Sequence, residues 1–141
     1  MPEHPNARGR TAARLAALLV VTLVCGCGGG NALPPGTAKS GSLTGQLTTS
    51  PTPARVGLDT IFVVTLSDGG APVTGANVNI ALFFRGLNQT GPTSPCSPTA
   101  PGRYETPGLV TGMAGKWEAE VTVSRPNHPD ARLTLSFNVA R

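Results

Sequence analysis

Apolar and polar residues alternate with a period of two along several short stretches of the chain. Such alternation is typical of a β-strand that buries one face, because successive side chains of a strand point to opposite sides. The clearest stretch runs from Lys116 to Val123, and its inward positions are Trp117, Ala119, Val121 and Val123. The pattern therefore predicts that Trp117 is a core side chain and not an exposed platform for a ligand.

Further strands are predicted by the same alternation, and glycine- and proline-containing turns separate them. These strands cover residues 43–47, 58–66, 78–84, 104–106 and 133–139, the last with Phe137 on its inner face. Helical periodicity is absent, and 18 glycines and 14 prolines punctuate the chain. Short strands at this spacing predict an all-β fold, an immunoglobulin-like two-sheet β-sandwich of about seven strands.

Residues 86–101 contain mostly Gly, Pro, Ser, Thr and Asn, with little apolar material. Pro92, Pro95 and Pro98 lie in this segment, and Cys96 lies among them. This composition predicts a mobile loop. A thiol in such a loop is expected to be accessible to reagents and to other cysteines.

The N-terminal residues have the features of a secretory signal. Three arginines precede an apolar run, residues 15–24, which is shorter than the roughly 20 residues of a membrane-spanning helix. Residues 24–27, Val-Cys-Gly-Cys, resemble the lipobox of bacterial lipoproteins. The resemblance implies that Cys27 carries a diacylglycerol, that the chain is cut before Cys27 and that the new amine is acylated. Cys25 is a poorer acceptor, and an ordinary signal peptide with a chance cysteine is the alternative.

These features divide the chain into three parts. Residues 1–26 are predicted to be the lipoprotein signal peptide, 27–42 a lipidated cysteine with a flexible Gly/Pro/Ser tether, and 43–141 the folded domain. The mature protein is then expected at the cell envelope, anchored by lipid on the extracytoplasmic side of a membrane. In a Gram-negative cell that location is the outer membrane, facing the periplasm. The membrane is one expected partner, and another envelope protein is a candidate for a second.

The charge of the chain changes when the signal is removed. The full chain carries a net charge of +4, whereas residues 27–141 hold eight Lys/Arg and six Asp/Glu, a net of +2. The charges are scattered, without the basic stripe that nucleic-acid binding requires. A nucleic-acid partner is therefore not expected.

Three segments of the domain resemble the YtkA-like family. Residues 68–78 resemble its "dG.PV.GA.V" turn, and residues 102–104 and 112–118 resemble its "G.Y" and "MaGkW" segments, in the same order and spacing. The resemblance covers roughly residues 49–139. It implies a small extracytoplasmic immunoglobulin-like domain, related to FixH-like proteins of respiratory-oxidase assembly. Some members carry segments rich in methionine and histidine before "G.Y", which suggests copper handling.

The corresponding segment of this chain, residues 85–98, has neither methionine nor histidine. The mature chain offers only Cys96, Met113 and His128 as soft or imidazole ligands for copper. Met113 and His128 flank a predicted strand, so they are expected at opposite ends of the domain. Met113 is interpreted as an apolar plug and His128 as a solvated turn residue. No metal or other cofactor is expected, with copper as the alternative.

Catalytic chemistry has little support in the sequence. His128 is the only mature histidine, and Asp130 beside it is expected to serve the turn. Glu118 and Glu120 are two residues apart on an outward strand face beside Lys116, which is the usual pattern of a solvated surface. The chain is therefore interpreted as a non-enzymatic binding or accessory module of the cell envelope. The alternatives are a copper-handling accessory protein and a purely structural envelope module.

Overall fold

The structure, a computed structural model, describes Leu33 and residues 35–141. Its regular elements are β-strands and one short 3₁₀ turn, so the all-β prediction is confirmed. The strands are β1 (Thr37–Ser40), β2 (Leu43–Ser50), β3 (Ala54–Arg55), β4 (Asp59–Asp68), β5 (Ala71–Pro72), β6 (Asn77–Phe84), β7 (Gln89–Ala100), β8 (Arg103–Glu105), β9 (Leu109–Val110), β10 (Gly115–Ser124) and β11 (Ala131–Ala140). The 3₁₀ turn η1 (Arg85–Leu87) follows β6. None of the described residues forms a helix with the length and apolar character needed to cross a bilayer.

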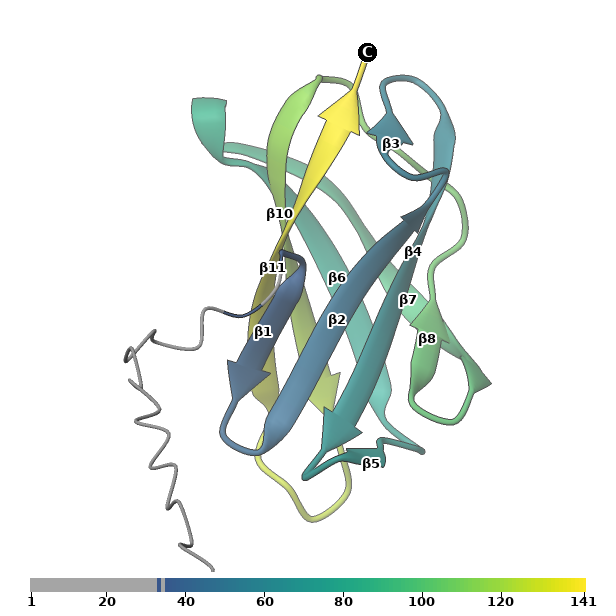
Figure 1. Ribbon diagram of the computed structural model, residues 1–141, viewed down its shortest axis with the longest axis vertical. Helices are drawn as coiled ribbons and strands as arrows, with labels where there is room; N and C mark the ends of the chain where they lie inside the picture. Colours follow the sequence, from purple (N-terminus) through teal and green to yellow (C-terminus); the bar gives the residue numbers. More distant parts are fainter. Residues whose placement is uncertain (1–32, 34) are drawn as a thin grey trace, which may run out of the picture. The chain divides into compact units, whose positions relative to one another are not determined.

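The strands form one continuous hydrogen-bonded sheet in the order β1-β2-β4-β8-β7-β6-β10-β11-β3, with β5 and β9 added to β4 (Figure 1). Two separate sheets and about seven strands were expected, and eleven strands on one sheet are found in the described residues. The difference arises at β7, whose first part pairs with β6 and whose end pairs with β8. Four of the additional elements, β1, β3, β5 and β9, have only two to four residues each.

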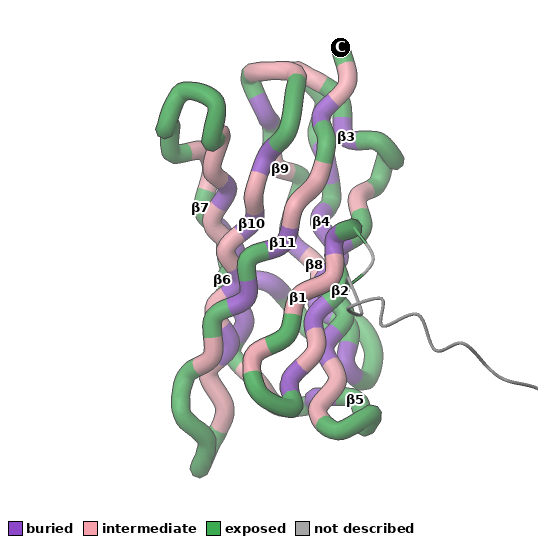
Figure 2. Tube along the Cα trace, turned by 60° about the vertical axis from the view of Figure 1, so that its left-hand side comes forward, coloured by how far each residue is buried: buried purple, intermediate pink, exposed green. Residues whose placement is uncertain are grey.

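The sheet curls until its two halves face each other across a shared core. Phe62 of β4 and Phe137 of β11 meet edge to face across this core, with ring centroids 5.0 Å apart. Gly45 permits the close approach of β2 to β11, since a Cβ there would lie 2.5 Å from a methyl group of Leu133. Buried residues alternate with intermediate or exposed ones along the long strands β2, β6, β10 and β11 (Figure 2). The predicted inward residues of β10 are all buried, Trp117 with 3% of its surface exposed.

The segment expected to be a loop, residues 86–101, is instead mainly strand β7. Ser94 and Cys96 face the core, and their neighbours Thr93, Pro95 and Ser97 are exposed. The alternation is therefore present, but small and polar residues carry it in place of large apolar ones. Cys96 lies opposite Val78 of β6 and belongs to the core. The prediction of a mobile loop with an accessible thiol is wrong.

The predicted tether also contains structure at its C-terminal end. Thr37–Ser40 pairs with Leu43–Gln46 as β1, and the amide of Leu47 donates a hydrogen bond to the carbonyl of Gly36. The tether prediction is therefore wrong for residues 37–40. These residues lack apolar alternation, so the sequence pattern gives no sign of a strand, and backbone pairing with β2 holds them in place. The predicted signal peptide, residues 1–26, and Cys27 lie outside the described residues.

Candidate functional site

The three candidate copper ligands occupy separate places in the fold. Met113 precedes β10 and His128 follows it, so they lie at opposite ends of this strand, as predicted. Cys96 lies within β7 and faces the core. Within the described residues, no group of three or more His, Cys, Asp or Glu side chains is placed to hold a metal ion. These residues do not fit a copper site.

Each of these side chains has an environment suited to a structural role. The Met113 side chain is half-buried against the core, and its carbonyl accepts a hydrogen bond of 3.0 Å from the indole N–H of Trp117. His128 lies in the exposed turn after β10, with Nδ1 3.0 Å from the carbonyl of Pro126. Asp68 of β4 also lies near this turn, and its carboxylate accepts a hydrogen bond of 2.6 Å from Arg125. Hydrogen bonds from Ser42 and Arg125 hold the pKa of Asp68 below its usual value.

Cys96 of the folded protein is expected to react slowly with thiol reagents. Only 8% of its surface is exposed, and burial raises the pKa of the thiol to about 11. A rise of about two pKa units leaves about 100-fold less reactive thiolate near neutral pH. Labelling with a maleimide at pH 7.5, followed by mass spectrometry, should be slow in buffer and fast in denaturant. Rapid labelling of the native protein would show that β7 opens.

A concave surface lies where the curled sheet nearly closes on itself. We call it the seam groove, and its volume is about 510 Å³. β1 lies beside β11 at this point, yet the strand pairing of the described residues joins β1 only to β2. The residues that line the groove come from the start of the domain, from β10 and from β11. They are Leu33, Pro35, Gly36, Thr37, Lys116, Thr134, Ser136, Phe137 and Asn138.

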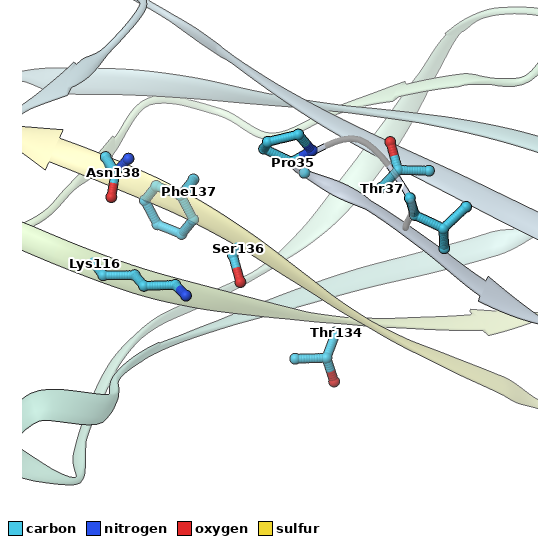
Figure 3. A pocket seen from close by; sticks show the side chains of 9 residues that line it. Pro35, Thr37, Lys116, Thr134, Ser136, Phe137 and Asn138 are labelled. Carbon is cyan, nitrogen blue, oxygen red and sulfur yellow. The ribbon is translucent and has the colours of Figure 1, made fainter. Parts of the chain in front are cut away.

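The lining combines an aromatic ring with polar groups (Figure 3). Phe137 is half-buried, and its inner side contacts Phe62 and stacks against Trp117 with centroids 6.3 Å apart. Thr134, Ser136, Asn138 and Lys116, on the outer face of β10 and β11, contribute hydroxyl, amide and ammonium groups to the same groove. The volume lies within the range of small-ligand sites, about 300–1,000 Å³. Polar atoms make up about half of the groove surface, so its chemistry favours a polar or charged ligand over an apolar one.

Lys116 lies between the seam groove and a second groove. The second groove, of about 420 Å³, is lined by Phe84, Arg85, Gly86, Lys116 and Glu118. Arg85 forms an ion pair with Glu118, and Arg132 lies 3.6 Å from Glu120. The two glutamates considered as a catalytic pair are thus each engaged by a different arginine. Lys116 has no carboxylate partner among the described residues.

Sequence reasoning did not find the seam groove. The alternation of residues 133–139 predicts that Thr134, Ser136 and Asn138 are solvated, as Lys116 is on its strand, and that Phe137 lies in the core. The polar residues do alternate along the outer face of their strands. Nothing in the alternation of one strand indicates that Leu33 and residues 35–37 lie beside it, so the sequence held no signal for the site.

Comparison with known proteins gives one match. The YtkA-like family model matches residues 37–122, from the start of β1 to near the end of β10. The match begins at β1 and includes β7, two of the elements that the sequence pattern did not predict. No curated protein and no solved structure matches the chain.

Proposed function

We propose that this chain, which belongs to the YtkA-like family, is a non-enzymatic binding or accessory module held at the extracytoplasmic side of a membrane. The domain is a rigid β-sheet support, and its binding site is the seam groove. The proposal has two parts, a lipid anchor at Cys27 and a ligand site close to that anchor.

The observation that carries the proposal is the position and lining of the seam groove. Phe137 and Pro35 provide apolar surface, whereas Lys116 and the neighbouring hydroxyl and amide groups provide polar contacts. The groove begins at Leu33, only six residues after the predicted lipidated cysteine. A ligand in the groove would therefore be held near the membrane surface, which suits an accessory module of the envelope.

The geometry does not favour the copper-handling alternative. Copper requires thiolate, thioether or imidazole groups that converge. Cys96 is buried in β7, and Met113 and His128 lie at opposite ends of β10.

Replacing Cys27 by alanine tests the anchor. The wild-type protein should sediment with membranes, and its mature N-terminus should have the mass of a lipidated Cys27. The Cys27→Ala chain should be uncleaved or released in soluble form, because several acyl chains are needed for stable anchoring.

A photo-reactive residue at Thr134 tests the groove, because Thr134 is exposed there. In the otherwise wild-type chain it should form a covalent adduct with the molecule bound in the groove.

Two controls make this experiment specific. Cys25→Ala should leave lipidation unchanged, because Cys25 is predicted to leave with the signal peptide. A photo-reactive residue at the exposed Asp130, in the turn after β10, should form no adduct above background. An unmodified Cys27 in the mature wild type contradicts the anchor. Equal adduct formation at Thr134 and Asp130 contradicts the binding role of the groove.

A further inference from the structure

The surface around the two grooves lies close to the predicted point of anchoring. Leu33 is six residues after Cys27, and an extended chain spans at most about 3.3–3.6 Å per residue, so about 20 Å separates the two at most. This step rests on the anchor of the proposed function. It places the seam groove within reach of the headgroup region of the bilayer.

This surface is basic. Lys116 is exposed and lies at the junction of both grooves, without an ion-pair partner among the described residues. Arg85 is paired with Glu118, but 62% of its side-chain surface stays exposed compared with 24% for the glutamate. Glu118 is the only carboxylate among the residues that line the two grooves. The lining therefore carries a net charge of +1, and its cations are more exposed than its anion.

One exposed leucine lines this surface, and a second directly follows the residues of the second groove in the sequence. Leu87 has 67% of its surface exposed and ends η1, whose Arg85 and Gly86 share the second groove with Lys116. Leu33 has 40% of its surface exposed and lines the seam groove. Basic residues flanked by exposed apolar side chains are the combination found on protein surfaces that lie in the interface of anionic membranes.

We propose that this face docks on the surface of an anionic phospholipid bilayer, with a lipid headgroup at the seam groove. Lys116 attracts the phosphate, and the hydroxyl and amide groups of Thr134, Ser136 and Asn138 are the available hydrogen-bond donors. Leu87 enters the headgroup layer from η1. The lipid on Cys27 supplies the anchoring, and this face sets the orientation of the domain on the membrane.

The test places a fluorescent label at one of two cysteines in the full lipidated chain, reconstituted in vesicles that contain headgroup-quencher lipids. Leu87→Cys reports on the proposed face, and Asp130→Cys reports on the turn at the opposite end of β10 from Lys116. The buried Cys96 should not compete for the label. We expect strong quenching at position 87 and weak quenching at position 130 in phosphatidylcholine vesicles that contain phosphatidylglycerol. In pure phosphatidylcholine the difference should largely disappear.

Charge reversal shows whether Lys116 carries the docking. A surface charge contributes about a fivefold factor to binding at an anionic membrane, so Lys116→Glu should lower the ratio of docked to undocked protein about 25-fold. Arg103→Glu is the matched control, because Arg103 of β8 is half exposed and lines neither groove. If both variants lowered the ratio equally, membrane binding would depend only on the net charge of the protein and not on this face, and the proposal would be overturned. Equal quenching at positions 87 and 130 would also overturn it.

The Cys27→Ala chain separates this proposal from the proposed function. Without a lipid it should still co-sediment weakly with phosphatidylglycerol vesicles, in a manner that depends on Lys116. If Cys27 proves unmodified, this measurement still decides the docking. If the wild type is not anchored by lipid but vesicle binding still depends on Lys116, only the anchor is contradicted. If the wild type is anchored by lipid but vesicle binding does not depend on Lys116, only the docking is contradicted.

Discussion

Replacing Trp117 by alanine should lower the free energy of unfolding by about 3–5 kcal/mol, the usual cost of removing a large buried aromatic side chain. The indole is 3% exposed, and its ring lies between Phe84, with centroids 5.3 Å apart, and Phe137. Truncation also leaves the carbonyl of Met113 without its indole hydrogen bond. A domain of this size has only about 5–15 kcal/mol of stability, so chemical denaturation should show a large shift of the midpoint.

Two further substitutions separate packing from hydrogen bonding at this position. Trp117→Phe keeps an aromatic ring and removes the indole N–H, so it should cost less than alanine. Thr122→Ala on the same strand, on its outward face, should leave the midpoint nearly unchanged. A midpoint that does not move in Trp117→Ala would show that the tryptophan is not part of the core.

Replacing Gly102 by alanine should destabilise the domain by about 2–4 kcal/mol, from backbone strain and overpacking together. Its φ of +71° is a conformation that residues with a side chain rarely adopt, and a Cβ would lie 2.7 Å from the carbonyl oxygen of Leu66. The same Cβ would lie 3.0 Å from the Cβ of Pro72. The nearest contact is backbone of a central strand, so a small side-chain movement cannot relieve it.

Gly70→Ala is the control for strain alone. Its φ is +88°, but a Cβ there meets no atom within 4 Å. It should cost about 1–2 kcal/mol, the price of a left-handed conformation. Thermal unfolding of both variants compares them directly. An equal loss of stability would mean that the crowding around Gly102 relaxes without cost.

The strands with large apolar residues at alternate positions were predictable, and those without them were not. In β10 the alternation from Trp117 to Val123 identified both the strand and its buried face. In β7 the inward positions are Ser94 and Cys96, which are too small and polar to stand out from a loop composition. β1 lacks apolar alternation altogether and depends on its backbone pairing with β2.

The seam groove was beyond prediction for a different reason. Its walls come from Leu33 and residues 35–37 and from β10 and β11, which are far apart in sequence. The alternation within Thr134–Asn138 indicates which side chains point outward. It does not indicate which other segment lies beside them, because that depends on how the whole sheet curls. The separation of Met113 from His128 was predictable because a single strand joins the two.

The place of β11 in the sheet has a consequence for the order in which the domain can fold. This last strand pairs with β10 along its whole length and with β3 from the start of the domain, and it contributes Leu133 and Leu135 to the core. Pairings between such distant segments form late, because a long loop must close first. A chain that is synthesised from its N-terminus cannot complete this core until residues 131–140 are available. Shortened chains that end before β11 are therefore expected to stay unfolded.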